Sequence, residues 1–359
     1  MASRKKGSGM HKQIPHTMEF SELLMDPLTH TATGLFLSRI GLKRWTPLAT
    51  PILLLAANAP DIDIVTASGG GLSYLHYHRH LTHSLVAMPV MALLPVVLVR
   101  LVARKPVHWA GAFFAALIAV ASHLLLDLTN AYGIRLLLPF SAEWLRLDLN
   151  NIYDLWIWGV FLLCVGGPLV GRLVGSEIAS GGAPGKHHGR GFAWLALLFV
   201  LVYDCGRGVL HARAVATLES RLYAGAVPTR VAALPGPANP MLWKGVADTG
   251  DFYAVDSVDL LAGFDPTRAL ILYKPPPDAA IEAARRTPAF QEMERFSQFP
   301  LWRVSPAPDL PDGRMVQLSD LRFGTPSAPG FMATAILDAR LEPVRAWFQW
   351  GIASRTQGK

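Results

Sequence analysis

The chain has 359 residues, of which 51% are hydrophobic and only 16% charged, with a formal net charge of +7. Soluble globular proteins carry about 25% charged residues, so this deficit points to a chain that lies partly in lipid. The basic residues fall mostly in short loops between apolar runs, as the positive-inside rule describes. No zinc-finger, helix-turn-helix or RNA-binding signature accompanies them, so we expect no nucleic-acid partner.

The cysteine content does not suggest a secreted disulfide scaffold. The two cysteines, Cys164 and Cys205, lie inside apolar segments and indicate neither a disulfide framework nor a thiolate zinc site. Residues 1–27 form a basic tail that lacks the apolar segment of a cleavable signal peptide directly after its charges. We therefore expect this tail to precede the folded part of the chain.

Apolar runs dominate residues 28–215 and predict a helical membrane domain. A membrane helix needs about 20 mostly apolar residues, and residues 28–42 fall short of that. Five runs come close or qualify: 45–64, 84–103, 107–128, 155–174 and 191–209. We expect an all-α polytopic bundle of five or six membrane elements in a bacterial-type inner membrane. The basic loops place the following domain on the outer side.

Short alternating runs with turn signals replace the long apolar runs after residue 228. We predict strands and one helix over residues 228–359, which makes a small β-rich α+β extramembrane domain. The residues Thr249, Gly250 and Asp251 predict a hairpin between the first two strands. The predicted strands are 242–247, 252–258, 269–272, 301–304, 315–318, 331–337 and 344–350, and the predicted helix is 278–286.

The polar residues of the membrane half are few and fall at helix ends. They are His30, Asp61, Asp63, His78, Arg79, His80, His83, His123 and Asp127. His123 and Asp127 are the most informative pair, because their i, i+4 spacing puts both side chains on one face of an apolar helix. An ionisable group within a membrane costs at least about 2.5–3.5 kcal/mol, so two together need a reason. Imidazole and carboxylate are both good ligands for zinc, manganese or iron.

Each group also has a structural interpretation without metal. His30 can cap a helix or donate a hydrogen bond, and Asp61 follows Pro60 as an ordinary turn residue. The three histidines His78, His80 and His83 can lie in a solvated loop. His123 and Asp127 can form a buried hydrogen-bonded pair. The predicted topology places four groups on one side of the membrane: His30, the pair Asp61 and Asp63, the histidines of residues 78–83, and the pair His123 and Asp127. We therefore favour the metal hypothesis for the set.

In the predicted C-terminal domain, Asp320 and Arg322 predict an ion pair at a strand end. Asp154, in the membrane half, predicts a helix cap. We expect these residues to stabilise the fold.

Four sequence pieces together resemble the YdjM-type family of membrane-bound metal-dependent hydrolases. They are Thr29-His30-Thr31, Ala59-Pro-Asp-Ile-Asp63, His78-Arg79 with Leu81-Thr-His-Ser84, and Ser122-His123 with Asp127. The family is distantly similar to the helical phospholipase C and P1 nuclease group. The resemblance implies the metal ligands His30, Asp61, His78, His83, His123 and Asp127, with Asp63 and His80 auxiliary.

The sequence therefore predicts an integral membrane metal-dependent hydrolase, with zinc as the first expected metal and manganese or iron as alternatives. The expected substrate is a small phosphoester or lipid-derived molecule at the membrane surface. Asp61 and Asp127 are the expected proton acceptors, and Arg79 is expected to stabilise an anionic substrate. Two alternatives stay open: a non-enzymatic metal-binding scaffold or transport component, and an apolar bundle with a buried polar network and no metal. The sequence leaves the oligomeric state open.

Overall fold

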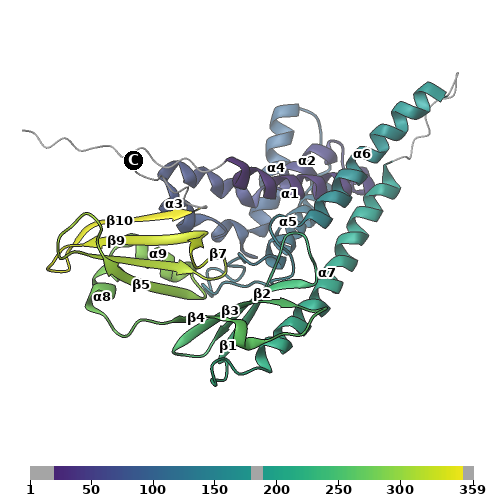
Figure 1. The fold of residues 1–359 in the computed structure, drawn as a ribbon. Coiled ribbons are helices and arrows are strands. Elements are labelled where there is room, and N and C mark those ends of the chain that lie inside the picture. The colour runs from purple at the N-terminus through teal and green to yellow at the C-terminus, as the bar shows by residue number, and fades with distance from the viewer. Residues whose placement is uncertain (1–19, 179–188, 351–359) are drawn as a thin grey trace, which may run out of the picture.

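The computed structural model describes residues 20–178 and 189–350, with side chains described from residue 27 to 171 and from 189 to 350. A helical half is followed by two antiparallel sheets and two short helices that lie along one side of it (Figure 1). This arrangement confirms the predicted fold class of a helical region followed by a β-rich domain.

The helical half consists of seven α-helices interrupted by short 3-10 segments in the described residues. The helices are α1 (Phe20–Ile40), α2 (Ala49–Ala56), α3 (Gly71–Tyr77), α4 (Met88–Ala103), α5 (Trp109–Thr129), α6 (Leu155–Ile178) and α7 (Arg190–Glu219). The 3-10 segments are η1 (Leu42–Arg44), η2 (Pro60–Gly69) and η3 (Leu81–His83).

Two described helices, α5 and α7, are long and apolar enough to cross a bilayer, and up to four spans result if each of two bent pairs counts as one. The described residues therefore contain two to four candidate spans, where the sequence predicted five or six membrane elements. The predicted apolar run 45–64 is divided because Pro60 begins a separate 3-10 segment, which is bent by 51° from α2. The predicted run 84–103 continues from α3 and η3 through a bend of 90°. These bends place polar residues at the ends of short segments.

Small residues let the helices of this half approach closely. The buried face of α5 carries Ala112, Ala115, Ala116 and Ala119, which pack in one core with α2 and α4. Gly34 on α1 has a similar role, because a Cβ atom there would lie 2.7 Å from the carbonyl oxygen of Leu53. Close contact between helices supplies van der Waals energy where lipid offers no hydrophobic gain.

The C-terminal β-rich domain, called the tail domain below, contains two four-stranded antiparallel sheets. The first has the order β1-β2-β3-β4, and the second has the order β10-β9-β6-β5. The strands of the first sheet are β1 (Arg230–Pro235), β2 (Leu242–Asp248), β3 (Phe252–Asp259) and β4 (Leu270–Tyr273). Those of the second sheet are β5 (Pro300–Pro306), β6 (Arg314–Asp320), β9 (Phe331–Leu337) and β10 (Pro343–Trp350).

Shorter elements connect these sheets. They are η4 (Pro266–Arg268), α8 (Ala279–Arg285), α9 (Pro288–Phe296), and the paired strands β7 (Gly324–Thr325) and β8 (Ala328–Pro329). All seven predicted strands and the predicted helix 278–286 are confirmed, and β2 and β3 pair as the predicted hairpin. The sequence analysis did not predict β1, α9 or the two-residue strands β7 and β8.

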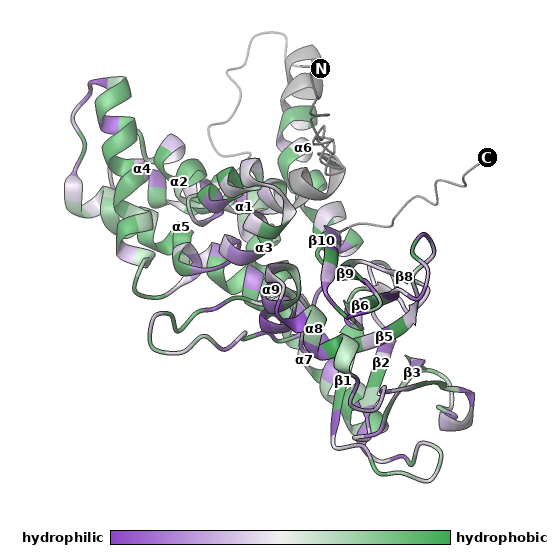
Figure 2. Ribbon diagram, turned by 90° about the vertical axis from the view of Figure 1, so that its left-hand side faces the viewer, coloured by the Kyte–Doolittle hydropathy of each residue, from purple (hydrophilic) through white to green (hydrophobic). Residues whose placement is uncertain are grey.

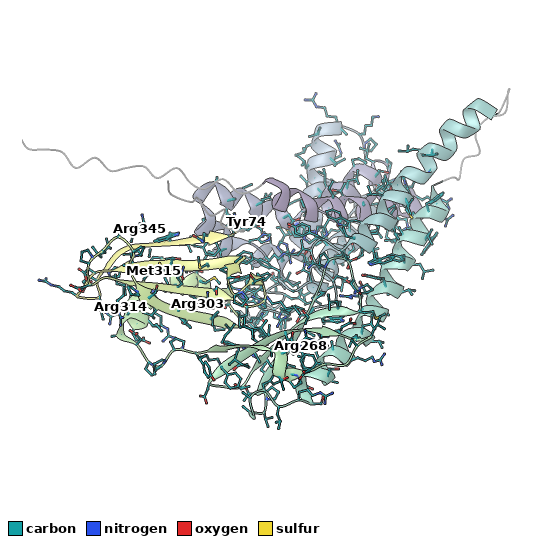
Figure 3. All side chains as sticks on the ribbon, viewed as in Figure 1. Tyr74, Arg268, Arg303, Arg314, Met315 and Arg345 are labelled. Carbon is teal, nitrogen blue, oxygen red and sulfur yellow. The ribbon has the colours of Figure 1, made fainter. Side chains whose placement is uncertain are left out.

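The two halves share hydrophobic cores. Ala214 and Leu218 at the end of α7 pack beneath the first sheet with Trp243. Leu75 on α3 and Tyr132, after α5, are buried in the same core as α8, α9 and the second sheet. Figure 3 shows Tyr74 of α3 beside the second sheet, and its ring contacts Trp350 at 4.7 Å between centroids. The tail domain is therefore packed directly against the helical half.

Lys244 on β2 provides a pH-dependent test of this packing. Its Nζ atom donates to the carbonyl oxygens of Leu321 and Gly324, each at 2.6 Å. Burial lowers the pKa of Lys244 to about 8, against the opposing effect of Asp320. An unfolded lysine titrates near pH 10.4, so the unfolded chain binds more protons between about pH 8 and 10.5, and stability rises with pH in that window.

We expect Lys244→Met to remove this rise. Thermal unfolding in detergent across the same pH window measures it, with the variant Lys105→Met, in the loop between α4 and α5, as control. A rise that persists unchanged in Lys244→Met would contradict the assignment.

Candidate metal centre

Four segments that are far apart in the sequence bring their polar residues to one place. His30 comes from α1, Asp61 from η2 and His83 from η3, while His123 and Asp127 come from the last turns of α5. His30, His83, His123 and Asp127 are each at most 1% exposed, and the Asp61 side chain is 14% exposed. The five predicted residues therefore converge, and Asp61 lies at the open edge of the group.

Four ligand atoms surround one point in this group. The Nε2 atoms of His83 and His123 are 3.2 Å apart, and each lies 3.3 Å from Asp127 Oδ2. Asp61 Oδ1 lies 3.5 Å from His83 Nε2 and 3.6 Å from His123 Nε2. Zinc–nitrogen bonds of about 2.0–2.1 Å in tetrahedral geometry place ligand atoms roughly 3.3–3.5 Å apart. The five distances among these atoms, 3.2–3.6 Å, are close to that spacing and suit a divalent ion held by His83, His123 and Asp127, with Asp61 beside them.

Hydrogen bonds on the far side of each imidazole fix its orientation. His123 Nδ1 donates to the carbonyl oxygen of Ala57 at 2.7 Å, and His83 Nδ1 lies 3.3 Å from Asp63 Oδ2. In both rings this leaves Nε2 directed at Asp127 with a lone pair available. A carboxylate or carbonyl behind a histidine is the usual arrangement for a metal ligand, because it fixes the tautomer and raises the basicity of the other nitrogen.

Asp127 is the carboxylate shared by most members of the group. Its Oδ2 atom receives no hydrogen bond from the described residues, although it is buried and lies between two imidazole nitrogens. Its Oδ1 atom lies 2.8 Å from Arg79 Nη2 and 3.5 Å from His30 Nε2. A buried carboxylate oxygen without a donor is costly unless a cation is nearby. This oxygen therefore fits a metal ligand.

Arg79 is held in place by several contacts. Its guanidinium also donates to Asn130 Oδ1 at 3.0 Å and lies 5.0 Å from the ring centroid of Tyr132. Burial raises the pKa of the Tyr132 phenol, against the opposing effect of Arg79, so the ring stays neutral beneath the guanidinium. Arg79 thereby connects Asp127 with the loop that follows α5.

Comparison with known proteins adds a family to this geometry. A sequence model of the YdjM inner membrane protein family matches residues 25–214, more than half of the chain. The chain belongs to the YdjM family. This membership agrees with the resemblance found in the sequence. The matched region contains every residue of the centre.

Two further similarities accompany this match. Residues 279–358 match the YfhP C-terminal alpha/beta plait domain. The chain is also 29% identical over 143 residues to the uncharacterized protein YfhP of Bacillus subtilis (strain 168), which covers 37% of this chain and 43% of that protein. The match thus covers less than half of the length of YfhP. No solved structure matches the chain.

Two predicted site residues, His78 and His80, lie outside this group. His78 Nδ1 lies 3.1 Å from Asp63 Oδ1, and its ring stacks on Tyr74 at 4.3 Å. His80 stacks on His76 at 5.9 Å between centroids. Neither histidine contributes an atom to the two ligand groups found among the described residues, which are His30–Asp61–His123 and His83–His123–Asp127.

Asp63 has a larger role than the auxiliary one that the sequence predicted. Its Oδ2 atom accepts from the backbone nitrogen of Arg79 at 2.9 Å and from Thr82 Oγ1 at 3.0 Å, in addition to its contact with His83. Sequence reasoning also missed Asn130 and Tyr132. The Asp-Ile-Asp spacing was a usable signal for Asp63, but nothing local marks the other two, whose contacts form across 51 or more residues.

We expect Asp63→Asn to weaken metal affinity by about 10–100-fold, because the loss of a carboxylate behind a ligand histidine has that effect. A competition titration with a chromophoric chelator measures the change in detergent-purified protein. Asp309→Asn, at an exposed position in the tail domain, is the matched control. Equal affinities for Asp63→Asn and wild type would contradict the orienting role.

Proposed function

We propose that this YdjM-family membrane protein is a metal-dependent hydrolase that acts on a phosphoester or lipid-derived substrate at the membrane surface. The observation that carries the proposal is a set of four ligand atoms, from His83, His123, Asp127 and Asp61, with five mutual distances of 3.2–3.6 Å. Two imidazoles and two carboxylates suit zinc best, and manganese or iron are the alternatives.

Zinc or a similar ion, when bound, supplies Lewis acidity toward the scissile group and lowers the pKa of water. His83, His123 and Asp127 are the proposed permanent ligands, with His30 beside them and Asp61 as an exchangeable fourth ligand. Asp61 is the proposed proton acceptor, because its side chain is 14% exposed and its Oδ2 atom receives no hydrogen bond from the described residues. Substrate therefore approaches from the side of Asp61.

Arg79 and His78 have supporting roles in this proposal. Arg79 holds Asp127 through an ion pair of 2.8 Å and adds positive charge that attracts an anionic substrate. His78, which the family resemblance implied as a ligand, contacts Asp63 and keeps that carboxylate in position behind His83. We propose further that the tail domain lies on the outer side of the membrane, as the basic loops indicate.

The depth of the centre favours a second candidate function. His83 and His123 are 0% exposed, which suits a structural ion in a non-enzymatic scaffold or transport component as well as a catalytic one. Structural zinc sites have four protein ligands, whereas catalytic sites keep one position open. The two functions therefore differ in whether Asp61 is a permanent ligand.

Turnover distinguishes them. We expect detergent-purified protein to hydrolyse a member of a panel of phosphodiesters and phospholipids, and a chelator to abolish the activity. Asp61→Asn is expected to lower kcat by about 100-fold or more while the protein stays folded. Stoichiometric metal with no turnover across the panel would favour the scaffold. Absence of metal in the wild-type protein would overturn both functions.

A further inference from the structure

The outer face of α4 is an apolar surface with no packing partner among the described residues. Val90, Leu94, Leu98 and Val102 recur at helical spacing on this face and are 47–76% exposed. The opposite face carries Met91, Ala92, Val96 and Val99, which are buried in the bundle core. Figure 2 shows α4 as a largely hydrophobic helix at the edge of the molecule. In a membrane protein such a face lies against lipid.

Exposed apolar residues also lie between the metal centre and the start of α4. Leu85 and Val86, immediately before the helix, are 50% and 53% exposed. The backbone nitrogen of Leu85 donates to the carbonyl oxygen of Leu136 at 3.0 Å, so the loop after α5 lies beside it. That loop exposes Leu137 by 39% and Phe140 by 86%.

The same two segments hold the centre. Leu85 follows His83 by two residues, and the backbone nitrogen of Arg135 donates to the carbonyl oxygen of Arg79 at 3.4 Å. Arg135 itself lies over the ring of Trp144 at 4.8 Å, which places a cation and an indole at the base of the loop. Aromatic and basic side chains around an apolar surface are typical of the boundary between lipid headgroups and acyl chains.

We propose that Leu85, Val86, Leu137 and Phe140 form an interfacial surface that lies in the boundary layer of the bilayer beside the metal centre. The argument is proximity: Leu85 and Val86 stand between His83 and the start of α4, and the loop of Leu137 and Phe140 is hydrogen-bonded to Leu85. The consequence that a membrane lipid, rather than a water-soluble ester, reaches the centre from this side rests on the proposed function. The lipid contact itself does not.

Site-directed spin labelling tests the contact directly. The two native cysteines, Cys164 and Cys205, are replaced by alanine, and Phe140→Cys then carries a nitroxide. Phe140 is 86% exposed, so its replacement leaves the core unchanged. Val86→Cys provides a second position. Leu98→Cys on α4 is the lipid-facing reference, and Leu261→Cys, 80% exposed after β3, is the water-facing control.

The labelled proteins are placed in vesicles of phosphatidylethanolamine and phosphatidylglycerol, and collisions with oxygen and with a water-soluble nickel chelate are measured. We expect the oxygen-to-nickel ratio at residues 140 and 86 to approach that at 98 and to exceed that at 261 several-fold. A ratio equal to that of 261 would overturn the proposal. A label that neither reagent reaches would also overturn it, because it would identify a protein contact instead.

A separate measurement addresses the source of the substrate. If the enzyme is active, Phe140→Asp is expected to lower turnover of vesicle phospholipid at least tenfold and to leave turnover of a short-chain soluble ester unchanged. Equal loss on both substrates would overturn the lipid route. Inactivity of the wild-type protein would reject the proposed function but leave the spin-label result intact.

Discussion

Replacing Asp127 by asparagine is expected to remove the bound divalent ion from the purified protein. Asp127 Oδ2 lies 3.3 Å from the Nε2 atoms of both His83 and His123, closer than Asp61 Oδ1 at 3.5 and 3.6 Å. The amide is neutral and a much weaker ligand for zinc. We expect metal content to fall from about one ion per chain to less than about a tenth, because a preformed ligand set supplies most of the affinity.

Elemental analysis of detergent-purified protein measures this change, and Asp204→Asn is the matched control. Asp204 is a carboxylate on α7 that accepts from Asn150 Nδ2 at 2.6 Å, away from the ligand group. Loss of Asp127 also leaves the buried Arg79 charge without its carboxylate, which destabilises the fold by about 3–5 kcal/mol. Metal is therefore counted per folded chain, and the neutral change His83→Gln provides a second test. Full metal occupancy in both variants would reject the centre.

Replacing Asp320 by asparagine is expected to lower the free energy of unfolding by about 3–5 kcal/mol, because it leaves a buried guanidinium without its carboxylate. The side chains of Asp320 and Arg322 are both 0% exposed, and Arg322 Nη2 lies 2.7 Å from Asp320 Oδ2. Arg322 also donates to the carbonyl oxygens of Ala131 and Phe296, each at 2.9 Å. The predicted ion pair is confirmed, and it connects the tail domain with the loop after α5.

The same pair predicts an acid-dependent loss of stability. Burial alone would raise the pKa of the Asp320 carboxyl. The opposing effect of Arg322 and of the hydrogen bonds to the carboxylate is larger, so the pKa lies below its ordinary value. A depressed folded pKa contributes stability that is complete above the unfolded value near pH 3.9 and is lost as pH falls through the folded pKa. We expect Asp320→Asn to lack this acid-dependent component.

Chemical denaturation in detergent measures both effects. Glu282→Gln is the control, because Glu282 forms an exposed pair with Arg285 and such pairs contribute about 0–1 kcal/mol. If Asp320→Asn unfolds within about 0.5 kcal/mol of wild type, the pair contributes far less than its burial implies.

Local pattern was sufficient to predict most of the elements. The strands of the C-terminal domain are short, alternate in polarity and end at turn residues, so their positions were predictable from the sequence. β1 was missed because Pro235 ends it and begins a Pro- and Gly-rich stretch, which resembles a linker. α9 is only 9 residues long, and its buried residues Phe290, Met293 and Phe296 make a helical pattern too short to separate from a loop.

The candidate site was predictable in part for a different reason. Polar residues in apolar helices are expensive, so His30, His123 and Asp127 were conspicuous without any structure. The residues that hold these side chains in place were not, because Ala57, Asn130 and Tyr132 are ordinary residues until the fold brings them within reach. The bend at Pro60 was also hidden, since an apolar run of 20 residues has the composition of a single span.

Burial of Leu75 and Tyr132 beneath α9 and the second sheet has a consequence for biogenesis. A ribosome delivers residues 20–219 to the membrane long before it has made β9, which ends at Leu337. Until then, the loop that supports Arg79 lacks its apolar cover. The centre can therefore be completed only after the second sheet has been synthesised and has packed against this loop. Early termination within the last strands would therefore leave a membrane-inserted protein whose ligand set is unfinished.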